Sequence, residues 1–226
     1  MRRSLSFLRP TSRSISGIVP RVSILGILTL GVVMPACSAL RPQADPSRFY
    51  VLTPMPTTSQ PAFPSLASLT IGVGPIVLPS YLQRPQIVSR VDENRLAISE
   101  VDRWADDLED SFTRVLAEDL SVLTGSVRVP TFPWLAALEP DYQIVVGVLA
   151  FEKERQQANL RARWMIRTWK QKEILLVRDS TILEPTPSRG TAGGVAALSA
   201  AVTTLAREIA AALDTVHRKA AASNAH

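Results

Sequence analysis

The 226-residue chain has very few of the side chains that catalytic and metal sites use most often. It contains one cysteine, Cys37, and two histidines, His217 and His226. A disulfide within one chain is therefore impossible, and both histidines lie in an alanine-rich, polar end where no pocket is expected. Neither a Gly-x-Ser-x-Gly elbow nor a His-Glu-x-x-His pair occurs. We predict no catalytic residues, no metal site, no cofactor and a protein that is not an enzyme.

Acidic residues are absent from the first 36 positions, and this changes the meaning of the net charge of +5. Five arginines precede Cys37, and removing them from the 25 Lys and Arg leaves 20 against 20 Asp and Glu. The remainder of the chain is close to neutral. A neutral domain has no long-range field that would concentrate a polyanion, so the charge pattern argues against nucleic acid as a partner.

The basic start is followed by an uncharged apolar run from Val22 to Met34. A bilayer span needs about 20 apolar residues, so the run is too short for a transmembrane helix and has the layout of a signal peptide. The single cysteine comes directly after the small residue Ala36. We predict a lipoprotein signal peptide over 1–36, cleavage between Ala36 and Cys37, and lipidation of Cys37. A buried core cysteine is the alternative, but it gives no reason for this position.

Residues 37–48 are rich in Pro, Ser, Ala and Gln, and we interpret them as a flexible, lipidated tether. If extended, the segment from Cys37 to Phe49 could reach roughly 40 Å. Ser38, as a residue other than aspartate after the cysteine, is similar to an outer-membrane address of bacterial lipoproteins. We predict attachment to the periplasmic face of the outer membrane, with a domain at 49–217 and a disordered tail at 218–226.

The first half of the domain shows short strands and then a helix. Phe49–Leu52 is β-prone, a proline-rich connector follows over 54–64, and Leu69–Val73 alternates as a strand that we expect to stop at Gly74 and Pro75. Gln86–Val91 and Arg95–Val101 indicate a hairpin. Large apolar residues then recur at steps of three and four from Trp104 to Leu123, which predicts an amphipathic helix. We expect Asp102 to cap its start and Gly125 to end it.

The second half indicates three strands and a closing helix. Tyr142–Phe151 is apolar on both alternating faces, as in a central strand covered on both sides. Leu160–Trp169 alternates, with Arg161, Arg163 and Arg167 on a face that must be wet or ion-paired, and Ile174–Val177 completes an antiparallel meander. Val195–Val216 has the spacing of a second amphipathic helix with an alanine-rich back. The fold class that follows is α/β: a single mixed, largely antiparallel sheet packed by two amphipathic helices.

Two further clusters have simple structural explanations. Asp106, Asp107, Glu109 and Asp110 could suggest a metal site, but on a helix they spread over the solvent side, and we interpret them as a solvated face. The glycines Gly190, Gly193 and Gly194 lack the Lys-Ser/Thr of a phosphate loop and are expected to lead into the last helix.

The segment LPSYLQRPQIVSR, Leu78–Arg90, followed by DRWADDLEDSFTRVLAEDL, Asp102–Leu120, strongly resembles the ABC-type transport auxiliary lipoprotein family, the PqiC-like lipoproteins. The resemblance extends to the opening Phe49–Leu52, to the motif Ala162-Arg163-Trp164 and to the closing helix. Gln83 stands where the family often has an acidic or amide residue, directly before the core Arg84–Val88. The family brings no catalytic residues.

The resemblance implies a fold similar to the amino-terminal domain of TolB and work beside an MCE-domain protein of an ABC lipid transport system between the two membranes. The function we predict is that of a non-catalytic docking subunit. A stand-alone periplasmic carrier of lipid or another hydrophobic ligand is the alternative, and self-association into a homo-oligomer is left open, because an alanine-lined helix and an arginine-bearing strand face could both pack on copies.

Our hypothesis for partner contact is the proline-bounded loop with Tyr81, Leu82, Arg84, Pro85 and Gln86. Tyr and Arg are enriched at binding hot spots. The alternative is a loop that packs on its own sheet, with Arg84 paired to an acidic neighbour.

Overall fold

The structure, a computed structural model, describes residues 45–57, 60–135 and 137–223. Pro46–His226 forms one compact unit, and every element below belongs to it. Cys37 and Ala36 lie outside the described residues, so their predicted lipidation and cleavage stay predictions.

Seven strands form one mixed sheet: β1 (Arg48–Tyr50), β2 (Ile71–Val77), β3 (Gln86–Asp92), β4 (Arg95–Trp104), β5 (Tyr142–Glu154), β6 (Gln157–Thr168) and β7 (Ile174–Pro185). The order is β1-β4-β3-β5-β6-β7, with β2 beside β5. The long pairings β5–β6 and β6–β7 are antiparallel, while β1–β4, β2–β5 and β3–β5 are parallel. The predicted α/β class, with one mixed sheet and two helices, is confirmed.

The hairpin β3–β4 is also confirmed. By contrast, the prediction that the strand before it stops at Gly74 and Pro75 is wrong, because β2 continues to Val77. Its pairing with β5 shifts by a bulge between Val73 and Ile76. A bulge accommodates an extra residue without ending the ladder, so the Gly-Pro pair interrupts the register and not the strand.

Helix α2 (Leu108–Thr124) starts later than predicted. Its N-cap is Asp107, whose side chain accepts from the backbone N–H groups of Glu109 and Asp110, so the expected cap at Asp102 is wrong. Asp102 lies in β4 instead. The predicted end is confirmed: Gly125 has φ 71° and closes the helix in a left-handed turn that a side chain would strain.

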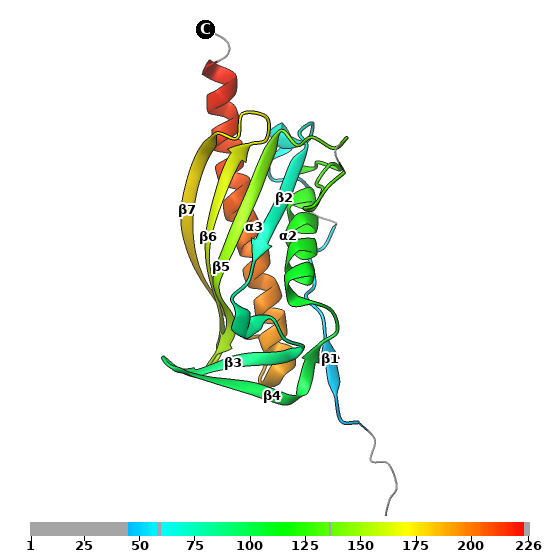
Figure 1. Cartoon of the computed structure of the whole chain (residues 1–226), viewed down its shortest axis with the longest axis vertical. Coiled ribbons are helices and arrows are strands. Elements are labelled where there is room, and N and C mark those ends of the chain that lie inside the picture. Colours follow the sequence, from blue (N-terminus) through cyan, green and yellow to red (C-terminus); the bar gives the residue numbers. More distant parts are fainter. Residues whose placement is uncertain (1–44, 58–59, 136, 224–226) are drawn as a thin grey trace, which may run out of the picture. The chain divides into compact units, whose positions relative to one another are not determined.

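Helix α3 (Gly190–Ser223) crosses behind β5, β6 and β7 (Figure 1). Among the described residues it is the one helix long and apolar enough to span a bilayer, but 67% of its most apolar window is buried within the domain. Ala197, Ala201 and Ala206 are buried as well, whereas Ala192, Ala196 and Ala200 are exposed. The prediction of a disordered tail at 218–226 is corrected, since the helix continues through Ser223 and only 224–226 lie outside the described residues.

The core lies between the sheet and the two helices. Phe112 on α2, Ile144 on β5 and Trp164 on β6 are almost completely buried there. The indole of Trp164 donates to Ser180 Oγ at 2.8 Å. The opposite face of β6 carries the three arginines as predicted, and Arg163 pairs with Asp179 of β7 at 2.7 Å. No helix of the described residues packs on that face, but β5 is exposed there only in part, since Leu149 is 53% exposed whereas Gln143 and Glu152 are buried. The expected cover of β5 on both sides is therefore only partly correct.

The chain between β1 and β2 runs over both helices. Thr53 N–H donates to Ser199 Oγ of α3 at 3.1 Å, and Met55 N–H donates to the buried Asp119 of α2 at 2.7 Å. Asp119 also accepts from Thr203 of α3 at 2.6 Å. One buried carboxylate therefore joins this segment to both helices, and burial raises its pKa.

Candidate functional site

The loop Leu78–Pro85 fills a gap in the sheet. Both β2 and β3 pair in parallel with β5, β2 along residues 142–147 and β3 at 153–154. They act as one interrupted strand, and the intervening loop lies beside the middle of β5. A short 3-10 turn, η3 (Ser80–Leu82), forms its centre. The sequence motif that carries the family resemblance therefore links two strands that pair with β5, so both ends of the loop are held by the sheet.

A buried carboxylate holds this loop in place. Glu152 of β5 has no exposed surface, and it points away from the helices under the loop. It accepts from the Tyr81 hydroxyl at 2.8 Å, from Arg90 Nε at 2.6 Å and from the backbone N–H of Phe151 at 2.8 Å. Its charge is therefore paired and hydrogen-bonded, which is the condition under which a charge can be buried without a large cost.

The electrostatics of the two partners agree with this arrangement. Burial, together with the hydrogen bond to Glu152, raises the pKa of Tyr81 to about 12. The hydrogen bond to Glu152 is also the main cause that raises the pKa of Arg90. Tyr81 thus stays neutral and Arg90 stays charged at every physiological pH, so the Tyr81–Glu152–Arg90 triad is a fixed support.

The five residues predicted as partner contacts separate into two groups. Leu82 is buried in the core, and Tyr81 is half-buried with its hydroxyl engaged. Gln86 is half-buried at the start of β3. Arg84 and Pro85 are exposed. Tyr81, Leu82 and Gln86 therefore support the loop from within the domain. Arg84 and Pro85 remain available for contact.

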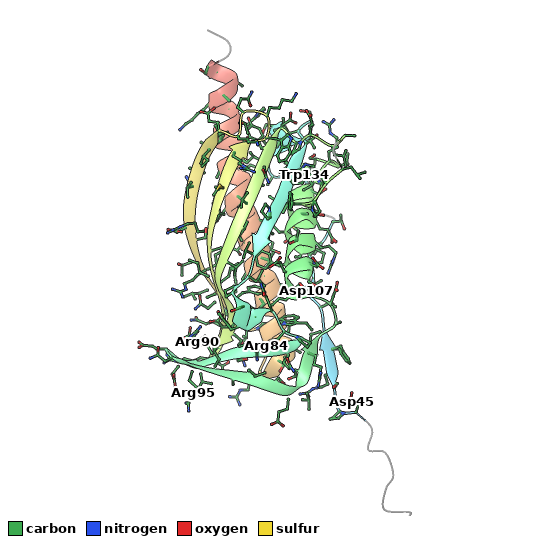
Figure 2. The ribbon with its side chains drawn as sticks, viewed as in Figure 1. Asp45, Arg84, Arg90, Arg95, Asp107 and Trp134 are labelled. Carbon is green, nitrogen blue, oxygen red and sulfur yellow. The ribbon has the colours of Figure 1, made fainter. Side chains whose placement is uncertain are left out.

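The guanidinium of Arg84 forms no ion pair or hydrogen bond with any residue that the structure describes. It lines a hollow of about 380 Å³ together with Gln83, Pro85, Trp104 and Asp107. Figure 2 shows Arg84 and Asp107 toward the same part of the domain, away from Trp134. The alternative in which Arg84 pairs with an acidic neighbour is not found among the described residues, and Asp107, which lines the same hollow, caps α2 instead.

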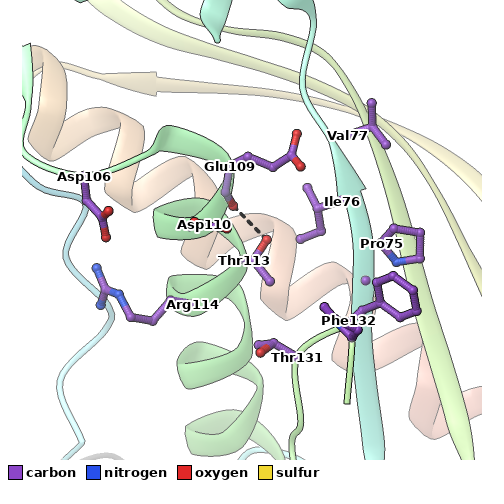
Figure 3. A pocket seen from close by; sticks show the side chains of 12 residues that line it. Pro75, Ile76, Val77, Asp106, Glu109, Asp110, Thr113, Arg114, Thr131 and Phe132 are labelled. Carbon is purple, nitrogen blue, oxygen red and sulfur yellow. Dashed lines mark hydrogen bonds between the residues drawn. The ribbon is translucent and has the colours of Figure 1, made fainter. Parts of the chain in front are cut away.

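A larger hollow, of about 650 Å³, lies between β2 and the first part of α2 (Figure 3). One wall is the second half of β2, and the other is formed by Glu109, Asp110 and Thr113 of α2. The first half of β2 is covered by the segment after α2, since Val73 N–H donates to the Pro130 carbonyl and the Val73 carbonyl accepts from Phe132 N–H. Beyond Val73, no strand of the described residues pairs with this outer edge of β2.

The acidic group at the start of α2 is partly structural. Asp107 is the N-cap, and Glu109 accepts from Leu78 N–H at 3.2 Å, which fixes the beginning of the loop. Asp106 and Asp110 are exposed and line the larger hollow, as expected of a solvated face. Within the described residues no group of three or more His, Cys, Asp or Glu is placed to hold a metal ion.

The end at which the chain enters the domain is fixed by another buried acid. Asp102 accepts from Arg48 of β1 at 2.7 Å and from Thr191 of α3 at 2.5 Å. Burial alone would raise the pKa of Asp102, but the hydrogen bonds from Thr191 and Arg48 outweigh it and lower this pKa. The residue expected as a helix cap therefore joins the first strand to the last helix. Neither Glu152 nor this role of Asp102 is apparent from the sequence pattern.

Solved structures share the fold. The protein XCC0632 from Xanthomonas campestris, of the family DUF330, has a TM-score of 0.63 at 16% identity, and the match covers 77% of this chain and 99% of that one. A second crystal structure, of an uncharacterized protein, has a TM-score of 0.62 at 17% identity, covering 74% and 98%. The PelC dodecamer from Paraburkholderia phytofirmans is more distant, with a TM-score of 0.38 at 13% identity over 68% and 93% of the two chains.

No curated protein sequence matches the chain. The family model described as ABC-type transport auxiliary lipoprotein component matches residues 50–210, which include the whole sheet after β1 and most of α3. The match spans well over half of the chain and contains the loop, the triad and both hollows. The chain belongs to the ABC-type transport auxiliary lipoprotein component family.

Proposed function

We propose that the chain is a lipid-anchored, non-catalytic docking subunit of an MCE-type ABC lipid transport system, attached through Cys37 to the periplasmic face of the outer membrane. The family match over residues 50–210 carries the proposal, because it makes the chain an auxiliary component of ABC-type transport. The lipid specificity, the MCE partner and the membrane are our inferences from the resemblance of the loop motif and from Ser38.

The loop geometry supports a docking role. An unpaired arginine that is held on a rigid support loses little conformational freedom when it binds, and arginine is enriched among residues that dominate binding energy. Arg84 has this position: it is exposed, lacks a described partner and follows a turn that the triad fixes from below. We infer that Arg84 and Pro85 contact the partner, while Tyr81, Leu82 and Gln86 position them.

The hollows support docking more than carrying. The larger one is open and lined by three carboxylates, those of Asp106, Glu109 and Asp110. Pockets that hold apolar ligands are lined mainly by hydrophobic and aromatic side chains. Six of the twelve residues that line the larger hollow are polar or charged, which makes it a poor site for a lipid chain.

The docking role is tested by comparing two arginine variants in the full, membrane-attached chain. Arg84→Ala should abolish co-purification of the MCE-domain protein and leave the melting temperature unchanged. Arg189→Ala is the matched control, because Arg189 is also exposed but lies in the connection between β7 and α3. Equal retention of the MCE-domain protein by both variants would refute contact through Arg84, and loss in both would point to a nonspecific effect of charge.

The anchor is tested separately by mass spectrometry of the chain from membranes. Diacylglycerol on Cys37, and its loss with release of the protein in Cys37→Ser, is the expected result. An unmodified amino-terminal segment that begins before Cys37 would contradict the anchor without affecting the docking role.

Self-association is part of the proposal. Some alanines of α3 are buried within the same chain, but Ala192, Ala196 and Ala200 are exposed and remain available to a copy. The open face with Arg161 and Arg163 remains exposed. Light scattering of the purified unit would show whether copies associate, and charge reversal at Arg161 should weaken any such assembly.

A further inference from the structure

The end of the domain farthest from β1 exposes an unusual number of large apolar side chains. They come from the segment between α2 and β5: Val127 is 93% exposed, Phe132 48%, Leu135 75% and Leu138 43%. Single exposed apolar residues are normal on a soluble protein, whereas a cluster of them marks a contact site. We call these four residues, with Trp134 and Trp169, the apolar tip.

Two tryptophans form the base of the apolar tip. Trp134 makes edge-to-face contacts with Phe132, at a centroid distance of 5.5 Å, and with Trp169 at 5.0 Å. It lies directly on β2 at Gly72, where an added Cβ would be 2.9 Å from the indole ring. The glycine therefore lets the ring approach the strand. Figure 2 shows Trp134 at the end of the domain opposite to Arg84 and Arg90.

Both indoles are only partly covered, and neither donates its N–H to any residue that the structure describes. A buried indole in a protein interface needs an acceptor, whereas Trp is favoured at the membrane–water boundary because its ring is apolar and its N–H reaches polar headgroups. The tip thus presents two indoles whose polar edges still lack a partner.

Charged side chains of both signs lie beside the tip, Lys170 and Lys172 together with the acidic Glu139, Asp141 and Glu173. Lys170 and Lys172 lie in the turn after β6, next to Trp169, and both are exposed. Lys170 faces Glu139 at 3.7 Å, and Lys172 has no described ion pair. Lysine is depleted in the cores of protein–protein interfaces, while lysines beside an apolar surface strengthen binding to anionic lipid.

The tip is far from the point where the chain enters the domain. Thr191, near the start of α3, bonds to Asp102 at the β1 end, and His217, near the end of the helix, lies 3.3 Å from the Tyr142 hydroxyl at the tip end. These two residues are 26 positions apart, which corresponds to about 39 Å along a helix. A lipid on the tether and a lipid at the tip would therefore be bound at opposite ends.

We propose that the apolar tip is a second membrane-contact site, which inserts Leu135, Leu138 and the two indole edges into the interface of a bilayer that contains anionic phospholipid. The site recognises a lipid surface through apolar insertion and through the charge of Lys170 and Lys172. It goes beyond the docking role, because it needs neither Arg84 nor a protein partner, and either can fail without the other.

The experiment uses residues 46–226, which contain the entire described core and no lipidation site. This unit is mixed with vesicles of phosphatidylcholine alone or of phosphatidylcholine with phosphatidylglycerol, and binding is followed by sedimentation. Brominated lipids report insertion through quenching of tryptophan fluorescence. We expect binding to the anionic vesicles, with quenching, and at least roughly tenfold weaker binding without phosphatidylglycerol.

Leu135→Asp should weaken binding at least roughly tenfold with an unchanged melting temperature, because the side chain is exposed and inserts only into lipid. Leu183→Asp is the control, since Leu183 is also exposed but lies on β7. Absence of vesicle binding, or equal effects of the two variants, would overturn the proposal. A photocrosslinker at position 135 that captures protein and no lipid in intact cells would overturn it as well and make the tip a protein contact.

Discussion

Removal of Arg90 should destabilise the domain far more than removal of an exposed arginine. In Arg90→Met the carboxylate of Glu152 keeps its hydrogen bonds from Tyr81 and Phe151 but loses the guanidinium at 2.6 Å. Glu152 has no exposed side-chain surface, and Arg90 is only 20% exposed. Removing one partner of a buried ion pair costs about 3–5 kcal/mol, because the other charge is left uncompensated.

The expected loss is large enough for an ordinary denaturation experiment. In a domain of this size 1 kcal/mol lowers the melting temperature by roughly 2–4 °C, so Arg90→Met should lower it by roughly 6–20 °C. Urea titration followed by circular dichroism gives the free energy of unfolding, and an unchanged m-value confirms that the same surface is exposed on unfolding. Arg163→Met is the matched control: its pair with Asp179 is exposed on both sides, and such pairs contribute about 0–1 kcal/mol.

A double variant that also removes the charge of Glu152 should recover part of the lost free energy of unfolding. In Arg90→Met/Glu152→Gln the uncharged amide can keep the acceptor for Tyr81 and Phe151, so about 1–3 kcal/mol of the loss should be recovered relative to Arg90→Met alone. A double variant as unstable as the sum of the two single variants would refute the reasoning. So would a loss below about 1 kcal/mol in Arg90→Met.

Three further predictions concern other buried or strained positions. Tyr81→Phe should cost about 1–2 kcal/mol below pH 10; the raised pKa of about 12 makes this contribution disappear between pH 10 and 12, so urea titrations of both proteins should converge there. Because the pKa of Asp119 is raised in the folded state, protonation of this carboxyl stabilises the fold at acidic pH. This stabilisation is lost as the pH rises through the folded-state pKa. Asp119→Asn should abolish this pH dependence and cost less than about 1 kcal/mol at neutral pH, and a larger loss by urea titration would show that the charge itself is needed. Gly125→Ala should lower stability by about 1 kcal/mol, measured as a melting-temperature shift, because φ is 71° there; an unchanged value would contradict the left-handed cap.

Periodic features of the sequence predicted much of the fold. The meander β5–β7, the hairpin β3–β4 and the two helices follow from alternation and from steps of three and four, because these patterns reflect which side chains face the core. The arginine face of β6 was predictable for the same reason. Sheet order was not, since nothing local indicates that β2 and β3 both pair with β5.

The errors arose where a residue type has more than one use. Aspartate occurs as a helix cap and as a buried acceptor, and Asp102 and Asp107 are five positions apart, so pattern alone chose the wrong one. Gly74 and Pro75 are strong turn signals, but in the structure they form a bulge and β2 continues beyond them. Glu152 ends a run of apolar residues, and its burial depends on Tyr81 and Arg90, which are more than 60 residues away in the chain.

For the loop Leu78–Pro85, the sequence did not distinguish the residues that are buried from those that are exposed. Tyr81 and Arg84 are both typical binding residues, and only the structure shows that the hydroxyl of Tyr81 is engaged. The apolar tip was not predicted, because its residues belong to an irregular loop without periodicity and are brought to Trp169 by the fold.

The attachment of β1 determines how the domain would respond to a mechanical pull on the proposed tether. β1 pairs in parallel with β4, and within a few residues Arg48 adds a bond to β4, Thr53 one to α3 and Met55 one to α2. A force transmitted through residue 47 acts along the strand, so it loads these bonds together in shear and does not open them one after another. Tension between the anchor and a docked partner would thus be carried by β4, α2 and α3, and the domain should yield as a unit rather than peel from its first strand.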